Sequence, residues 1–413
     1  MSKNINVYRV WLFLLVFSFF YELPLITLTF DRLNPRLLDV TFIIGVLLYL
    51  TNNGGSYETN QVYNRWRRIV LWFLVCAIIS VVFLLPSSYR LFSFLAALRY
   101  VESLLLIGIA LSMPIDKKTV FHAAYLRLLL DSVYCIFQYG HPTVRELSPG
   151  NFVTVDYLTG PLSSSYFEIS QLLPLAVVLI LALAEDLKMS KSSRAFYQVS
   201  SILMCWPLLF TGSRTGLLLG AISLMVYLFT RQKKNYVLII LLAGISVFFV
   251  SRFDKETSDL YTITRAMNLE EDEHDSFGER IEVSRMFDFE SYDNALIMPL
   301  FGAGFDVAPV NGNYRVDYGV HSMFLYPLEQ SGIMGFVLFV LFLWFCLKYF
   351  YRNRKVNPLA MGAFSYLVAM MITGIGAHNF WREFSSGNVN TFIVLVFCLA
   401  YKFSYEESKS FAH

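Results

Sequence analysis

Long apolar runs alternate with short polar segments along the whole chain. These runs predict twelve membrane-spanning helices, because a bilayer core needs about 20 apolar residues per helix. The predicted spans are 8–28, 37–51, 69–85, 91–112, 118–138, 167–184, 196–210, 214–230, 236–250, 321–347, 356–376 and 389–403. No small-residue cleavage site follows the first run, so we expect a retained helix rather than a signal peptide.

Composition excludes an ordinary soluble domain. Hydrophobic residues make up 56% of the chain, charged residues 15%, and the mean hydropathy is +0.53. We therefore expect an all-α polytopic fold, one integral membrane domain over residues 1–413, with a large loop, 251–320, inside it. The five cysteines fall in apolar runs without metal-type spacing, so we expect small buried hydrophobes, no metal site and no cofactor.

The basic residues of the short connecting segments predict the orientation. With a cytoplasmic N-terminus, the inner segments hold 18 Lys and Arg and the short outer loops hold 6. Positive residues favour the cytoplasmic side, so we expect both termini inside and loop 251–320 outside. That loop carries 15 acidic and 6 basic residues, which argues against a nucleic acid partner.

Two polar segments at span boundaries are candidates for chemistry. Arg214 lies in a glycine-bearing turn, Thr211–Gly216, between two apolar runs. Arginine is suited to bidentate phosphate binding, although an anchor to the outer headgroups is the alternative. His321 directly follows the long loop and is a candidate general base, or else a polar helix cap. Glu329 follows two helical turns later, to pair with an arginine or to end in a solvated crevice.

Other charged residues are weaker candidates. Arg280 and Arg285 lie in 278–289, a stretch of helical apolar spacing that also fits a solvated amphipathic helix. The acidic run 270–275 fits a solvated loop or a divalent cation site. His378 lies in the last outer loop with Trp381 and Arg382 and is the alternative to His321 as the histidine of the site.

Charges inside predicted spans need a partner or a cavity. Arg127 and Asp131 have the i,i+4 spacing of a pair that neutralises itself. Arg99, nearer the outer leaflet, is the better candidate for an anionic ligand.

The glycines of Pro299–Phe305 predict a turn with close backbone approach.

Three motifs in order resemble the O-antigen polymerases and ligases of bacterial envelopes (the Wzy and WaaL proteins). The first is the helix start at Ser213–Leu218. The second is Gly278-Glu279-Arg280 followed by Pro299–Phe305, and the third is His321-Ser322 with Glu329–Gly335. The resemblance extends over nearly the full chain through the twelve spans and the single large outer loop.

The resemblance implies a GT-C-type membrane glycosyltransferase fold with a large helical periplasmic loop. It implies a glycan donor on undecaprenyl pyrophosphate, a lipid-linked acceptor glycan, and a separate chain-length regulator as a partner. By position, Arg214 and Arg280 would bind the pyrophosphate and His321 would serve the acceptor hydroxyl. Arg99, Arg285, Glu329, His378 and Arg382 are the expected substrate-binding residues.

We therefore expect a polysaccharide polymerase in the bacterial inner membrane, with its active site on the periplasmic face. An O-antigen ligase, whose acceptor is a lipid A core, is the nearest alternative. A flippase or transporter of lipid-linked sugars is the alternative from another class, and a non-catalytic scaffold is the third.

Overall fold

The computed structural model describes residues 2–18, 35–51, 60–113, 117–140, 166–187, 189–209, 213–231, 297–305, 307–310, 313–316, 322–375, 380–381 and 388–410. Its α-helices are α1 (Ser2–Ser18), α2 (Leu37–Thr51), α3 (Gln61–Ile79), α4 (Ser87–Ser112), α5 (Lys117–Gly140), α7 (Tyr166–Asp186), α8 (Lys191–Leu203), α9 (Arg214–Thr230), α14 (Ile297–Phe301), α15 (Leu325–Asn353), α16 (Pro358–Thr373) and α17 (Asn388–Ser410). A π-helical turn, Ser80–Leu84, extends α3, and a 3₁₀ turn, Trp206–Leu209, follows α8.

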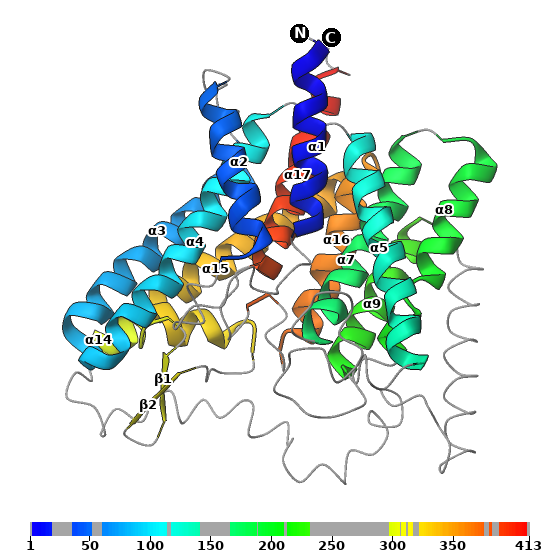
Figure 1. Ribbon diagram of the computed structural model, residues 1–413. Coiled ribbons are helices and arrows are strands. Elements are labelled where there is room, and N and C mark those ends of the chain that lie inside the picture. Colours follow the sequence, from blue (N-terminus) through cyan, green and yellow to red (C-terminus); the bar gives the residue numbers. More distant parts are fainter. Residues whose placement is uncertain are drawn as a thin grey trace, which may run out of the picture.

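The described helices form a closed circuit around α17 (Figure 1). In order, α2, α1, α5, α7, α16, α15, α3 and α4 each pack against the next, and α4 returns to α2. Inside this circuit, α17 contacts α3, α4, α7, α15 and α16, while α9 packs outside on α7 and α16. Because α17 has neighbours on several sides, its residues Phe392–Ala400 are all buried, and this run is apolar on every face.

Membrane spans occur where the apolar runs predicted them. Five helices are long and apolar enough to cross a membrane, namely Gln61–Leu84, Ser87–Ser112, Lys117–Gln138, Ile169–Asp186 and Leu325–Asn353. Five shorter apolar helices accompany them within the described residues: Val7–Ser18, Leu37–Thr51, Thr215–Thr230, Pro358–Thr373 and Val389–Tyr405. The chain is a multi-pass membrane protein.

Three of the twelve predicted spans have a different outcome. The span 8–28 is described only as far as Ser18, where α1 ends, and its remaining residues lie outside the described part of the chain. The span 196–210 is wrong in its bounds, because α8 runs from Lys191 to Leu203 and a 3₁₀ turn replaces its second half. Pro207 explains the break, since proline has no N–H for the helical ladder. The span 236–250 lies outside the described residues, and the number of spans therefore stays a prediction.

The all-helical prediction missed a short hairpin in the long loop. Strands β1 (Val307–Val310) and β2 (Asn313–Val316) pair antiparallel, with Val307 opposite Val316 and Val310 opposite Asn313. The sequence carries a signal for it in Asn311-Gly312, the dipeptide most typical of two-residue hairpin loops. The helical stretch predicted for 278–289 lies outside the described residues.

The chain termini and the described part of the long loop lie at opposite ends of the helices. Figure 1 shows the N- and C-termini at the top, and α14 with β1 and β2 at the bottom. Ion pairs link helix ends on the terminal side, where Lys117 at the start of α5 meets Asp186 at the end of α7, 2.7 Å apart.

Candidate functional site

The Pro299–Phe305 turn and helix α15 are built around glycines that leave no room for side chains. Gly302 and Gly304 have φ values of 79° and 111°, which only glycine adopts readily. A Cβ on Gly302 would lie 2.3 Å from the carbonyl carbon of Gln330. The amide of Ala303 donates a hydrogen bond of 2.7 Å to the carbonyl oxygen of Glu329. The predicted close backbone approach is confirmed at Gly302, while Pro299–Phe301, the first part of the predicted turn, belong to helix α14.

Helix α15 is interrupted where this turn meets it. Gly332 has φ 67° and ψ −172°, a conformation outside the helical region. A Cβ there would stand 2.2 Å from the carbonyl oxygen of Leu300. The first segment of α15 is therefore locked against the turn by two glycines, each facing the backbone of the other segment.

Helices α3 and α4 complete the packing of this turn. The Trp72 indole N–H donates 3.1 Å to the carbonyl oxygen of Ser331, and the Trp72 ring stacks on Phe301, with centroids 5.8 Å apart. The Ser93 hydroxyl accepts a hydrogen bond of 2.7 Å from the amide of Phe305. Partners outside the helical ladder thus satisfy the Ser331 carbonyl and the Phe305 amide, two backbone groups next to the break.

The start of α15 is tied to the end of α16 and to Trp381. The amide of Met323 donates 2.8 Å to the carbonyl oxygen of Gly374, and the Trp381 indole N–H donates 2.9 Å to the carbonyl oxygen of Met323. Trp381 is fully buried and stacks on Tyr326, with centroids 5.6 Å apart. These bonds join two chain segments that lie 58 residues apart.

Two predicted site residues adjoin this junction in sequence. His321 is two residues before Met323, and Arg382 directly follows Trp381. Both residues lie outside the described residues, so their positions toward a substrate stay a prediction.

Arg214 is the first residue of α9. Ser213 caps this helix, its hydroxyl accepting 3.1 Å from the amide of Gly216. A Cβ on Gly216 would lie 2.3 Å from the Cβ of Ser170, so the start of α9 lies directly against α7. The unpaired amides of a first helical turn favour an anion. The backbone of Arg214 is thereby fixed, while its side chain lies outside what the structure describes.

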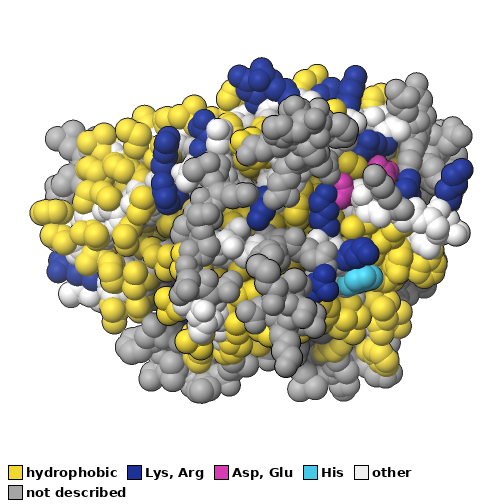
Figure 2. Space-filling view, turned by 90° about the horizontal axis from the view of Figure 1, so that it is seen from above, with side chains coloured by type: hydrophobic (Ala, Val, Ile, Leu, Met, Phe, Trp, Pro, Cys, Tyr) yellow, Lys and Arg dark blue, Asp and Glu magenta, His cyan; other side chains and the backbone are white. Residues whose placement is uncertain are grey.

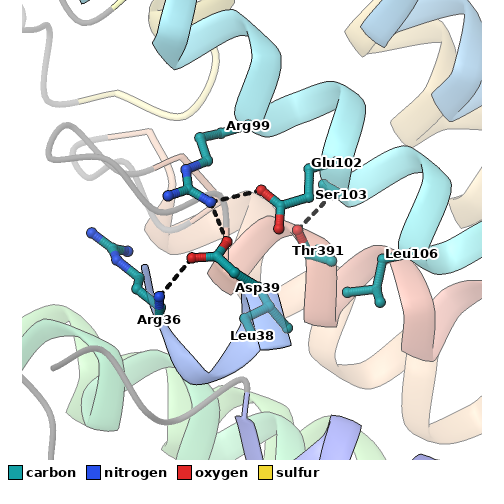
Figure 3. Close-up of a pocket in the computed structure, with 8 residues that line it drawn as sticks. All are labelled: Arg36, Leu38, Asp39, Arg99, Glu102, Ser103, Leu106 and Thr391. Atoms are coloured by element: carbon teal, nitrogen blue, oxygen red, sulfur yellow. Dashed lines mark hydrogen bonds and ion pairs between the residues drawn. The ribbon is translucent and has the colours of Figure 1, made fainter. Parts of the chain in front are cut away.

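Figure 3 shows a charged pocket between α2, α4 and α17. Arg99 forms ion pairs with Asp39 and with Glu102, and its Nη1 lies 2.7 Å from Glu102 Oε2. The Asp39 carboxylate also accepts 2.6 Å from the amide of Arg36. Beside them, the hydroxyls of Ser103 and Thr391 lie 2.5 Å apart. Leu38 and Leu106 supply the apolar part of the lining.

This pocket lies partway along the length of α4, and its charged side chains Arg99, Asp39 and Glu102 are mostly buried. Arg99 is 12 residues into α4, which is about 18 Å along the helix from its start at Ser87. The first turns of α2 and α17 reach it there, through Asp39 and Thr391. Intramembrane charges normally face a cavity or a partner. Two carboxylates and two arginines make this pocket close to charge-balanced.

Arg99, a predicted site residue, is thus paired with carboxylates of its own chain. Its role toward an anionic ligand stays a prediction. The role of the Glu329 side chain also stays a prediction, while the Glu329 carbonyl oxygen accepts the hydrogen bond of the Ala303 amide. Arg280, Arg285, His321, His378 and Arg382 lie outside the described residues. Sequence reasoning missed Asp39, although an acid at the start of an apolar run was a visible signal.

Two simpler predictions are confirmed. The fully buried Arg127 and Asp131 pair with each other at 2.8 Å. All five cysteines are free thiols, four of them buried and Cys205 half-buried. Neither feature contributes to the candidate site.

Comparison with protein families gives a match over about a third of the chain. Residues 199–340 match the model of the family described as O-antigen ligase (Wzy_C). The matched segment contains Arg214, the Pro299–Phe305 turn and the broken start of α15. A search of curated proteins found no significant match.

Proposed function

Because residues 199–340 form a domain of the O-antigen ligase and polymerase family (Wzy_C), whose members are membrane glycosyltransferases acting on lipid-linked glycans, we propose that this protein is a polysaccharide polymerase. It transfers a glycan from undecaprenyl pyrophosphate to a hydroxyl of a second lipid-linked glycan. The fold proposed for it is of the GT-C type.

The observation that carries this proposal is the interlock of the Pro299–Phe305 turn with α15 inside the matched segment. Gly302 and Gly332 join two of the motifs on which the resemblance rests. The bond between Trp381 and Met323 joins the start of α15 to the segment after α16, and in the sequence His321 and Arg382 adjoin these two residues. This supports a site where the long loop enters the helices.

The proposed chemistry needs no metal. Displacing a pyrophosphate from an anomeric carbon places negative charge on the leaving oxygens, and Arg214 and Arg280 stabilise that charge with charge-assisted hydrogen bonds. His321 accepts the proton of the attacking hydroxyl. Arg99, Arg285, Glu329, His378 and Arg382 hold the substrates.

The proposed orientation puts the termini in the cytoplasm and the loop 251–320 in the periplasm. Figure 2 shows the face at the terminal end, where Lys and Arg side chains outnumber acidic ones. A basic face is typical of the cytoplasmic side. The described elements of the long loop lie at the other end of the helices (Figure 1).

The family description itself favours a second candidate, an O-antigen ligase acting on a lipid A core. Glycans extracted from cells lacking this protein distinguish the two. Single repeat units on the lipid carrier indicate a polymerase, and long unligated chains indicate a ligase. Intact units trapped on the cytoplasmic side would instead indicate a flippase and overturn both.

A further inference from the structure

The ends of α3 and α15 nearest the chain termini carry a group of cations, which we name the basic corner. Its members are Arg65, Arg67, Arg68, Lys348, Arg352, Arg354 and Lys355. The two helix ends are in contact, since the Arg65 guanidinium lies 4.2 Å from the centroid of the Phe345 ring. Further along, Tyr349 packs against Tyr401 in the C-terminal half of α17, with centroids 4.5 Å apart.

The cations of the basic corner differ from their neighbours in pairing. None of its seven side chains forms an ion pair in the described part of the chain. At the neighbouring ends of α5, α7 and α9 the cations are paired, Lys117 with Asp186 at 2.7 Å and Arg231 with Glu185 at 3.1 Å. The general preference of cations for one membrane side explains their presence, but not this difference in pairing.

Exposed apolar stripes lead directly to the basic corner. On α3, Leu71, Val75 and Ile78 are exposed and follow Arg68 at helical spacing. On α15, Leu341 and Trp344 are exposed and precede Lys348 on the same side. In a bilayer such stripes meet acyl chains, and tryptophan next to lysine or arginine is typical of the headgroup level.

We propose that the basic corner and these two stripes bind anionic phospholipid. The headgroup phosphate is held by Arg68, Lys348 and Arg352, and the acyl chains lie along the apolar residues of α3 and α15. Exposed cations next to an apolar surface complement a ligand that carries a phosphate and two hydrocarbon chains. The inference does not depend on the proposed glycosyl transfer.

The same two helices hold the Pro299–Phe305 turn at their other ends. Trp72 of α3 bonds to Ser331 of α15, and both helices pack side by side from there to the basic corner. A lipid bound to both helices stabilises their association, because it binds only when the two helices are packed together. Such a ligand raises the melting temperature.

The test is native mass spectrometry of the purified full-length protein from nanodiscs containing phosphatidylglycerol and phosphatidylcholine. The variant replaces three exposed cations, Arg68→Gln, Lys348→Gln and Arg352→Gln. One cation near the headgroups changes affinity about fivefold, so the triple variant should retain phosphatidylglycerol about 100-fold more weakly. Binding by the unmodified protein should weaken in high salt.

A matched control removes the same charge from the same face, through Lys118→Gln, Lys191→Gln and Arg194→Gln. We expect this control to retain phosphatidylglycerol like the unmodified protein. Equal losses in both triple variants would show only a general electrostatic effect, and unchanged retention in the first would remove the site; either result overturns the proposal.

If the first variant fails to fold, Arg68→Lys with Arg352→Lys keeps the charge and tests the site through melting temperature. Phosphatidylglycerol should then raise the melting temperature of the unmodified protein and of this variant alike. Equal stabilisation by phosphatidylcholine alone would contradict an anionic headgroup site.

Discussion

Gly332 and Leu300 are in backbone contact, and a Cβ added to Gly332 would stand 2.2 Å from the Leu300 carbonyl oxygen. With φ 67° and ψ −172°, Gly332 also occupies a region that is almost restricted to glycine. The break in α15 therefore depends on this residue twice, through its conformation and through the space beside it.

We expect Gly332→Ala to destabilise the protein by about 3 kcal/mol or more, since backbone strain of about 1–3 kcal/mol adds to the clash. Thermal melting followed by size-exclusion fluorescence measures this. Gly220→Ala, inside helix α9, is the control, because its Cβ would meet the end of the Leu208 side chain at 2.9 Å and Pro174 Cγ at 3.6 Å, and no backbone atom. Alanine favours a helix by about 1 kcal/mol over glycine, so the control should melt at or above the normal temperature.

The pair Arg127–Asp131 is buried on both sides, and its side chains are 3% and 1% exposed. Asp131→Asn leaves a buried cation without its partner, which costs about 3–5 kcal/mol. Replacing both, as Arg127→Met with Asp131→Leu, should restore most of the stability, because apolar residues of similar size need no desolvation. The melting temperatures of the two variants test this. A double variant as unstable as Asp131→Asn would mean that the pair does more than neutralise itself.

Sequence reasoning predicted what depends on local pattern. The bounds of α2 and α9 follow from apolar runs, the Arg127–Asp131 pair follows from i,i+4 spacing, and the turn follows from Gly302 and Gly304. Each of these three features can be predicted from a few residues that are neighbours in the sequence.

What escaped prediction depends on contacts between distant segments. Gly332 lies in an apolar run that reads as one continuous helix, and only the turn at Leu300 reveals why the helix breaks there. Asp39 is 60 residues from Arg99, and Met323 is 58 from Trp381. No periodicity in one chain specifies such partners, because they depend on how the helices pack around α17.

Arg99 tests whether the charged pocket has a structural role or binds a ligand. Arg99→Met leaves Asp39 and Glu102 facing each other, and we expect a loss of about 2 kcal/mol, moderated by partial exposure. Adding Asp39→Asn relieves the repulsion and should restore the melting temperature. Polymer should stay absent in this double variant if Arg99 binds the substrate. Polymer that returns together with stability would assign Arg99 a structural role only.

Arg214→Lys should not behave as a conservative change. Lysine keeps the charge but loses the planar fork that binds a phosphate bidentately. Losing such a contact costs about 2–4 kcal/mol of transition-state stabilisation, or roughly 100- to 1000-fold in rate. Turnover of a purified lipid-linked donor measures it.

Arg231→Lys, at the other end of α9, is the matched control, since lysine can keep an ion pair with Glu185. It should turn over normally. Normal polymer from a stable Arg214→Ala protein would instead return Arg214 to the role of a headgroup anchor.

The orientation is tested by a cysteine placed at Asp272 in the long loop. The charge asymmetry of the short segments, 18 basic residues against 6, predicts labelling by an impermeant thiol reagent in intact spheroplasts. The native cysteines lie in apolar segments and give the background. Labelling that requires permeabilised cells would place the loop in the cytoplasm and exclude a periplasmic active site.

His321 is the proposed general base for the acceptor hydroxyl. It precedes Ser322 and Met323, whose bonds to Gly374 and Trp381 fix the entry of the chain into α15. Removing a general base commonly costs about 100- to 10,000-fold in rate, so His321→Ala should bind the lipid-linked donor but leave it unconsumed. His378→Ala is the comparison, because His378 is the competing histidine of the last outer loop and should only weaken substrate binding.

The pH dependence separates a base from a structural cap. Neutral imidazole acts as the base, so the rate should rise as pH increases through the histidine ionisation, and a slow His321→Gln variant should lose that lower limb. If His321 has only a structural role, the rate does not depend on its protonation state. The pH–rate profile of the His321→Gln variant would then keep its lower limb. Normal turnover by His321→Ala, or a complete loss found only in His378→Ala, would contradict the proposal and leave His321 without a catalytic role.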